Sequence, residues 1–381
     1  MNWLYFGGLI DSTKRTIQRP HHIAKALQEF GDQVLGFNEP RSLAGVIFDF
    51  VKGKKLPLPK KAQIQNVTIG DGKTIIPTFF PKGLYPLPQK FLPSKIISMY
   101  KKAFLRQLVP FLDSNVNKFD FIWVSGVQNP EVINFLFNLF PKAKKIYDLI
   151  DDFPGLNKSG LIRESFNNFD GVVSINKNLL EKYKRWVKPP SLIIPNGVSF
   201  PEKPGFALKK RKIQKITYFG VFDFWFDWNL LETIISFLPE IQFHLAGIVG
   251  APFQKKMHRL LLHPNVFFEG HVPFSEIPSL LREADLLLIT WKECDMAKFA
   301  DPLKIKEALY AGIPVIYSFR TGDKIIDEKI IISCEPEEIV SIIRNHKIPG
   351  IEERSKWAEE IAKNYSWEVL TRRFRDFVIS L

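Results

Sequence analysis

The 381-residue sequence contains only two cysteines, Cys294 and Cys334. This excludes a disulfide framework or a cysteine-rich zinc site, and it is typical of a reducing cytosol. No uninterrupted apolar run approaches the ~20 residues that a membrane-spanning helix needs. The apolar start, residues 1–10, lacks the basic residues that precede the apolar core of a signal peptide, so we expect none. Aromatic residues make up 13% of the chain, which excludes a disordered protein.

Acidic residues are scarce in the first part of the chain. Residues 1–110 carry 17 Lys or Arg and 6 Asp or Glu, a net charge of +11, whereas the other 271 residues carry +2 of the total of +13. Residues 94–108 place apolar side chains at helical spacing among lysines. This pattern predicts either a basic amphipathic helix bound to an anionic membrane or a helix packed on its own domain.

Short apolar runs alternate with helical patterns along most of the chain. This alternation predicts an α/β protein with two doubly wound, Rossmann-like domains of parallel strands. We place an N-terminal domain at residues 1–198, a linker at 199–213, where Pro and Gly cluster before a basic run, and a C-terminal domain at 214–364. No Gly-x-Gly-x-x-Gly fingerprint follows a likely first strand, which argues against a nicotinamide-dependent oxidoreductase. No nucleic-acid reading element is recognisable, so we expect no nucleic-acid partner.

The strongest local signal is the segment from Asp301 to Glu307. Asp301 is suited to cap a helix and Pro302 to begin it. The free amides of a helix N-terminus favour a phosphate, and Lys304 lies in this first turn, with Glu307 on the same side three residues later. The segment therefore predicts either a site for a nucleotide diphosphate or an ordinary capped helix with an i,i+3 salt bridge.

The order of motifs resembles that of glycosyltransferases with the two-domain GT-B fold, in particular bacterial enzymes that build cell-surface polysaccharides. The resemblance covers nearly the whole chain. Its elements are the Gly7-Gly8 loop, Gln18–Leu27, Ile146–Phe153, Gly171–Asn176, Ile194–Val198, Tyr218–Gly220, Phe268–Val272, Ala284-Asp285, Asp301–Val315 and Trp367.

The resemblance implies a donor site on the C-terminal domain and an acceptor site on the N-terminal domain, facing each other across a cleft. Such enzymes transfer a sugar from a nucleotide diphosphate, for which we choose UDP, to an acceptor hydroxyl. Lys304 is expected to contact the diphosphate and Glu307 the ribose. The remaining donor-site candidates are Gly220, His271, Val272, Pro302 and Leu303, although His271 is equally compatible with a surface position.

On the acceptor side the candidates are Gly7, Gly8 and Arg19. Arg19 either reaches an anionic acceptor or the diphosphate, or it is a surface arginine beside two histidines. The resemblance also places the C-terminal helix, residues 365–381, back on the N-terminal domain. A lipid-linked or glycan acceptor, together with the basic N-terminal part, predicts a cytoplasmic enzyme that is peripheral on the inner face of the plasma membrane.

Two departures from the family pattern bear on the mechanism. Retaining members carry two glutamates eight positions apart, and the position eight residues before Glu307 is Phe299. A histidine that many retaining members carry is replaced by Asp151 and Asp152. We therefore favour inverting transfer with Asp152 or Asp151 as the general base. Alternatively, one aspartate caps a turn and the other pairs with Arg19 or a lysine.

The aspartates of this segment are not expected to bind a metal. Asp148 and Asp151 fall on opposite faces of a strand, and no other ligand cluster accompanies them. We therefore expect neither a metal nor another cofactor. A retaining enzyme and a catalytically silent scaffold in a polysaccharide assembly remain open as alternatives.

Overall fold

The computed structural model describes residues 1–7, 19–38, 41–42, 63–69, 74–80, 84–85, 119–126, 130–152, 166–209 and 212–381. The expected amphipathic helix at 94–108 and the candidate Gly8 lie outside these residues. Most of the basic residues of the segment 1–110 also lie outside them. None of the helices in the described parts is both long and apolar enough to cross a membrane.

The first half of the chain forms a mixed sheet in which most strands are parallel. Its described strands lie in the order β10-β9-β8-β7-β1-β2-β5-β4. They are β1 (Asn2–Phe6), β2 (Gln33–Phe37), β4 (Gln63–Ile69), β5 (Thr74–Phe80), β7 (Phe121–Ser125), β8 (Lys144–Leu149), β9 (Gly171–Ser174) and β10 (Ser191–Ile193). The short strands β3 (Arg41–Ser42) and β6 (Leu84–Tyr85) pair separately.

One pair of strands differs from the all-parallel expectation. β4 pairs with β5 in antiparallel register at one edge of the sheet. The sequence of β4 alternates polar and apolar residues instead of forming a continuous apolar run, which is the pattern of a half-exposed edge strand. A search for buried parallel strands therefore misses it.

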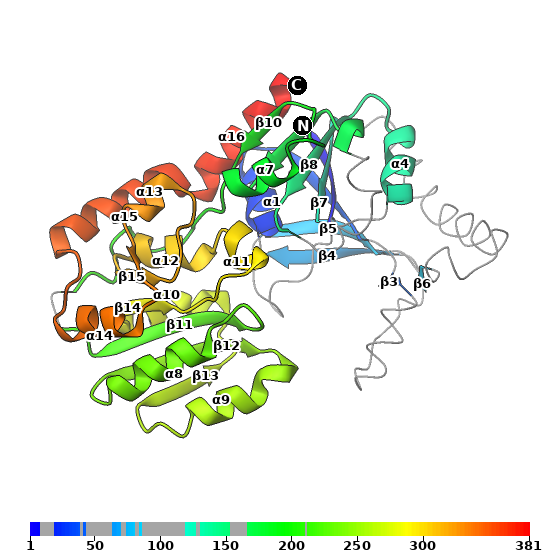
Figure 1. The fold of residues 1–381 in the computed structure, drawn as a ribbon. Coiled ribbons are helices and arrows are strands. Elements are labelled where there is room, and N and C mark those ends of the chain that lie inside the picture. The colour runs from blue at the N-terminus through cyan, green and yellow to red at the C-terminus, as the bar shows by residue number, and fades with distance from the viewer. Residues whose placement is uncertain are drawn as a thin grey trace.

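Helices pack on the first sheet, and one of them comes from the C-terminal end of the chain. They are α1 (Arg19–Glu29), α4 (Pro130–Leu139), the 3₁₀ turn η2 (Phe166–Asn168), α7 (Lys177–Tyr183) and α16 (Trp367–Ser380). Figure 1 shows α16, in red, lying against this part of the molecule, where it contacts α1. Trp367, Leu370 and Phe374 of α16 share a core cluster with Trp3 and Trp123. The end of the chain thus completes the core of the first sheet.

The second half forms a parallel sheet with the strand order β13-β12-β11-β14-β15-β16. Its strands are β11 (Lys215–Phe222), β12 (Gln242–Val249), β13 (Val266–Gly270), β14 (Leu286–Ile289), β15 (Val315–Tyr317) and β16 (Ile331–Ile332). Its helices and 3₁₀ turns are α8 (Trp228–Phe237), η3 (Ala251–Phe253), α9 (Gln254–Leu260), η4 (Phe274–Glu276), α10 (Ile277–Glu283), α11 (Asp295–Phe299), α12 (Leu303–Ala311), α13 (Lys324–Asp327), α14 (Pro336–Arg344) and α15 (Ile351–Tyr365).

The two halves are joined where the chain crosses between them twice. The amide of Val198 donates to the carbonyl of Tyr365 at 2.8 Å, and the amide of Trp367 donates back to Val198 at 3.3 Å. Nearby, His22 of α1 stacks on Trp367 and makes an edge contact with Phe274 of the second half. Burial lowers the pKa of His22 to about 3, helped by His21, so this ring is neutral at pH 7.

Candidate functional site

The second sheet changes winding direction between β11 and β14. These strands are neighbours, yet β12 and β13 continue to one side and β15 and β16 to the other. The loops that leave the two strands are tied together, because the amide of Asp227 donates to Thr290 at 2.7 Å and the amide of Lys292 to Trp225 at 2.8 Å. The carboxyl ends of strands at such a switch point are where doubly wound sheets bind ligands.

Two glycines lie opposite each other near the carboxyl ends of β11 and β12. Gly220 pairs with Gly247, and both have positive φ angles, 136° and 141°. A Cβ atom on Gly247 would lie 1.7 Å from the carbonyl oxygen of Gly220, so only glycine fits there. The two backbones therefore approach each other more closely than side chains would allow.

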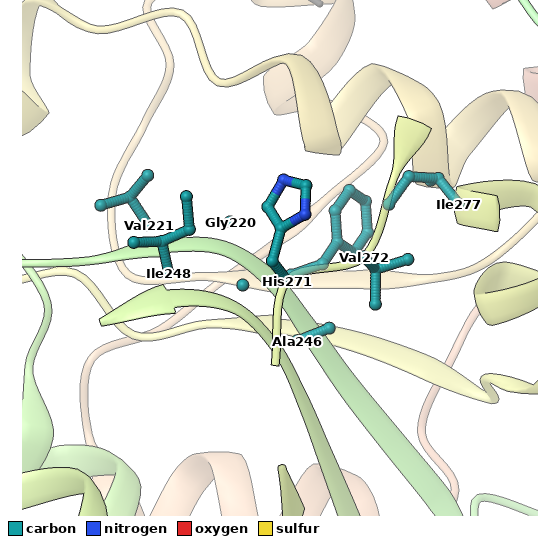
Figure 2. A pocket seen from close by; sticks show the side chains of 9 residues that line it. Gly220, Val221, Ala246, Ile248, His271, Val272 and Ile277 are labelled. Carbon is teal, nitrogen blue, oxygen red and sulfur yellow. The ribbon is translucent and has the colours of Figure 1, made fainter. Parts of the chain in front are cut away.

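A pocket opens beside these glycines. It is lined by backbone and side chains from β11, β12 and the segment after β13, with Gly220, Ile248, His271 and Val272 among its residues. Figure 2 shows the imidazole of His271 standing between the Val221–Ile248 pair and Val272. The structure thus brings the predicted residues Gly220, His271 and Val272 together in one pocket.

Lys304 lies directly beside Gly220. A Cβ atom on Gly220 would be 2.9 Å from Cε of Lys304 and 3.1 Å from its Nζ. The ammonium group lies 4.9 Å from the ring centroid of Trp291 and 5.4 Å from that of Tyr218. Within the described parts of the chain it forms no ion pair. Burial lowers the pKa of Lys304 to about 8, and the charge of Glu307 opposes this shift.

Glu307 lies one turn further along α12 and is 8% exposed. Burial raises the pKa of this carboxyl to about 7, against the stabilising charge of Lys304. Lys304 and Glu307 do not form the i,i+3 salt bridge that the ordinary-helix interpretation required. A half-buried cation and a buried carboxyl, neither neutralised by a direct contact, are the arrangement expected where a ligand supplies the partners.

The start of α12 differs from the sequence prediction. The N-cap residue is Pro302 rather than Asp301, the helix begins at Leu303, and no side chain caps it. Asp301 instead accepts hydrogen bonds from the backbone amide of Asn196, at 2.6 Å, and from the buried ammonium of Lys306. Asp301 thus anchors the end of the first half, and in the part of the chain that the structure describes no side chain accepts a hydrogen bond from the first amides of α12.

The predicted donor-site residues Pro302 and Leu303 lie at the start of α12 in different surroundings. Pro302 is buried. Leu303 packs against the core cluster of the first sheet that contains Trp3 and Trp123. The N-terminus of α12 therefore lies where the two halves of the protein meet.

The acidic end of β8 also lies between the two halves. Asp152 accepts hydrogen bonds from Lys182 Nζ and from the Tyr183 hydroxyl, each at 2.7 Å. Asp151 has no hydrogen bond or ion pair within the described residues. Burial raises the pKa of Asp151 to about 6, and the neighbouring charge of Asp152 adds to the effect. The two aspartates thus differ sharply, since one is paired with a lysine and the other is unpaired.

The acceptor-side candidates Gly7 and Arg19 lie next to strands of the first sheet, Gly7 directly after β1 and Arg19 at the start of α1. A Cβ atom on Gly7 would lie 2.2 Å from the Tyr5 hydroxyl and 2.4 Å from the Ser125 hydroxyl, so Gly7 leaves room for these side chains. Arg19 is 4% exposed. Its guanidinium donates to both carboxylate oxygens of Asp148, at 3.0 and 3.1 Å, and to the carbonyl of Pro195 at 3.0 Å. Arg19 is therefore a buried link between α1, β8 and the interdomain segment, and the surface position considered for it is wrong.

Several residues of this region were not named as site residues from the sequence, although Tyr218 belongs to the Tyr218–Gly220 motif. Trp291 and Tyr218 flank Lys304, and the indole of Trp291 donates to the Tyr218 hydroxyl at 3.3 Å. Lys182 contacts Asp152 from α7, whose sequence is that of an ordinary charged surface helix. The sequence offered only one indication of these three residues, which is that each lies near the end of a predicted strand or in the helix that follows it. Among the described residues, no group of His, Cys, Asp or Glu side chains is arranged to hold a metal ion.

Comparison with known proteins gives a match by structure alone. No protein-family model matches the sequence, and no curated protein is similar to it in sequence. Sucrose-phosphate synthase from Thermosynechococcus elongatus superposes with a TM-score of 0.70 at 13% identity, covering 100% of this chain and 99% of that one. The lipopolysaccharide outer core galactosyltransferase WaaB gives 0.62 at 13%, covering 100% and 99%. Anabaena HepE in complex with UDP gives 0.63 at 13%, covering 100% of both. The chain therefore has the GT-B fold of these glycosyltransferases.

Proposed function

We propose that this protein is a glycosyltransferase that moves a sugar from a nucleotide diphosphate, UDP in the first instance, to a glycan or lipid-linked hydroxyl. The observation that carries the proposal is the ammonium of Lys304, which has no ion-pair partner among the described residues and lies beside Gly220 in the first turn of α12, where none of the described side chains caps the helix. A cation, a close backbone approach and free helix amides are together suited to a diphosphate. HepE and pneumococcal GtfA, which share the fold, have been crystallised with UDP.

In this proposal Lys304 contacts the diphosphate and Glu307 accepts hydrogen bonds from the ribose hydroxyls. His271 and Val272 lie at the far side of the adjoining pocket and take the base. The same pocket has an aliphatic side formed by Val221 and Ile248, which are 41% and 50% exposed. Burying this exposed apolar surface against a ligand favours binding.

For the chemistry we propose inverting transfer with an aspartate of the β8 end as base. The base takes the proton of the acceptor hydroxyl while its oxygen attacks the anomeric carbon. The bond from that carbon to the diphosphate breaks, and the leaving diphosphate keeps the electron pair. A carboxyl with a pKa of about 6, as for Asp151, is suited to this step near neutral pH. Asp152 remains the second candidate, and its pairing with Lys182 weighs against it.

The donor site is tested by nucleotide binding. Purified protein is screened by thermal shift against UDP-, GDP- and dTDP-sugars, and the hits are measured by calorimetry. We expect a UDP-sugar to bind and Lys304→Ala to abolish the response. Lys324→Ala is the matched control, because this lysine of the same domain has a side chain that is 90% exposed. A scaffold without donor binding would give no response to any nucleotide, which would refute the proposal.

The acceptor side and the base are tested by transfer. Release of UDP from the bound donor is followed with wild type, Asp151→Asn and Asp152→Asn, and the anomeric configuration of the product is read by NMR. Wild-type turnover in both variants would refute an aspartate base, and a retained configuration would favour the retaining alternative. We also propose that no metal is required, so EDTA should leave turnover unchanged.

We further propose that the protein works at the inner face of the plasma membrane, attached through its basic N-terminal part. The support is the net charge of +11 in residues 1–110. Flotation with vesicles containing phosphatidylglycerol tests this proposal, with neutral phosphatidylcholine vesicles as the control. Binding that is absent, or independent of anionic lipid, would count against it.

A further inference from the structure

Lys182 is a charged side chain that contacts both halves of the protein. It extends from α7 of the first half, and its ammonium lies 2.7 Å from Asp152 at the end of β8. The same ammonium lies 3.5 Å from Asp295, the first residue of α11 in the second half. It also lies 4.3 Å from the ring centroid of Phe299 at the other end of α11. One cation thus joins the acidic strand end to the helix that faces it.

Asp152 is held from more than one side. Its second oxygen accepts a hydrogen bond from Tyr183 at 2.7 Å, and its side chain is 4% exposed. This nearly buried carboxylate thus has a lysine and a phenol as its hydrogen-bond donors. Both of its oxygens are therefore already engaged by donors of the protein.

The contact between α7 and α11 is more than one ion pair. The side-chain amide of Asn176, the N-cap of α7, donates to the carbonyl of Phe299 at 2.8 Å. A Cβ atom on Gly322 of the second half would lie 2.8 Å from the amide nitrogen of Asn178. Two asparagine side chains at the start of α7 thus lie against the backbone of the second half, on the same helix as Lys182.

We propose that Lys182 is a positioning residue, which engages Asp152 in an ion pair at the domain contact and thereby leaves Asp151 as the proton acceptor at this strand end. The proposal rests on the transferase function proposed above. It gives Asp151 and Asp152 different roles, whereas the sequence alone does not distinguish these two neighbouring carboxylates. Lys182 acts through Asp152 and touches neither donor nor acceptor.

The charged groups around Asp151 determine how removal of the Lys182 charge changes the pKa of Asp151. Asp152 is its chain neighbour just after β8, Lys182 and Tyr183 reach Asp152 from α7, and Asp295 of α11 contacts Lys182. Further back along β8, Asp148 is neutralised by the buried guanidinium of Arg19. Removing the Lys182 charge leaves Asp152 uncompensated beside Asp151. Two like charges so close disfavour ionisation, so the pKa of Asp151 must rise.

The direct test follows the titration of Asp151. Protein labelled with ¹³C at the aspartate carboxyls is titrated by NMR, and Asp151→Asn assigns the resonance. In wild type we expect this resonance to titrate near pH 6. In Lys182→Met its midpoint should rise by about one pH unit, whereas Lys182→Arg, which keeps the charge, should restore the wild-type midpoint. This measurement does not depend on turnover or on knowing the acceptor.

A control separates the charge from the domain contact. Asp295 is 79% exposed at its side chain, and Asp295→Asn removes the ion pair between Lys182 and α11 while leaving Lys182 on Asp152. We expect the Asp151 midpoint of this variant to stay at the wild-type value. An unchanged midpoint in Lys182→Met would overturn the proposal. Equal shifts in Lys182→Met and Asp295→Asn would also overturn it, because the effect would then come from a disrupted interface.

Turnover gives the second readout. In UDP release with water as acceptor at saturating donor, where the Glu307 limb of donor binding no longer limits the rate, the acidic limb of kcat should move to higher pH in Lys182→Met, and KM for the donor should stay the same. A lower rate at every pH without a displaced limb would contradict the positioning role. Failure of the transferase function itself is recognised separately, since wild type would then bind no nucleotide sugar while the NMR titration still reports on Lys182.

Discussion

The paired ionisation of Lys304 and Glu307 makes donor binding depend on pH in both directions. The pKa of Lys304 is about 8 and that of Glu307 about 7. If the diphosphate requires the ammonium and the ribose requires the carboxylate, the site is competent only when both groups are charged. The competent fraction is then largest near pH 7.5, and the apparent Kd becomes about sixfold weaker at both pH 6 and pH 9.

The direction in which pH changes donor affinity follows from Lys304 and Glu307 separately. Raising the pH through 8 deprotonates Lys304 and removes the charge that faces the diphosphate. Lowering the pH through 7 protonates Glu307 and weakens its bonds to the ribose. Lys304→Met should weaken binding by about 10- to 100-fold, the value of a charge-assisted contact, and should abolish the alkaline limb. Glu307→Gln should abolish the acidic limb and leave the alkaline limb in place.

The assay is calorimetric titration with an intact UDP-sugar between pH 6 and pH 9 at constant ionic strength. Two buffers with different ionisation enthalpies report the number of protons taken up on binding. Lys324→Ala serves again as the control for a general change in charge. A Kd that is independent of pH in wild type, or limbs that survive in both variants, would refute the reasoning about this pair.

Three predictions concern stability and are checked by denaturant unfolding. Asp32 accepts hydrogen bonds from the N-terminal amine, the Trp3 indole and the guanidinium of Arg375; burial opposes its ionisation, but these donors lower its pKa overall. Its contribution should therefore be present at pH 7 and lost as the pH falls below the ordinary carboxyl range, a loss that Asp32→Asn should remove. Gly247→Ala should destabilise the fold by more than about 3 kcal/mol and impair nucleotide binding, whereas Gly350→Ala, whose methyl would meet no atom beyond its chain neighbours within 4 Å, should cost no more than about 1 kcal/mol through the weaker N-cap of α15. Arg19→Met should cost about 3–5 kcal/mol because it leaves a buried carboxylate unpaired.

The framework of the fold was largely readable from the sequence. Short apolar runs marked the parallel strands, and their alternation with helical patterns predicted the two doubly wound halves. Both signals are local, because a strand buried on two faces must be apolar throughout and an amphipathic helix must repeat at its own period. The edge strand Gln63–Ile69 was missed, since a half-exposed strand lacks the continuous run.

The candidate site was predictable where it depends on one helix. Lys304 and Glu307 lie on the same side of α12 because their spacing alone places them one turn apart. The role of Asp301 was not predictable by the same reasoning. Its preference for an N-cap was overridden by Lys306 and by the amide of Asn196, which is distant in sequence.

The sequence by itself determined the α/β class, the parallel strands and the helix that carries Lys304 and Glu307, because each depends on patterns within a few residues. The tertiary structure alone decided which of two adjacent aspartates is paired, since Lys182 and Tyr183 reach Asp152 from another helix. It also decided that Arg19 is buried on Asp148 and that Gly247 faces the carbonyl of Gly220. In each case the deciding neighbour is far away in the chain, and the energies of burial and pairing depend on which groups the fold brings into contact.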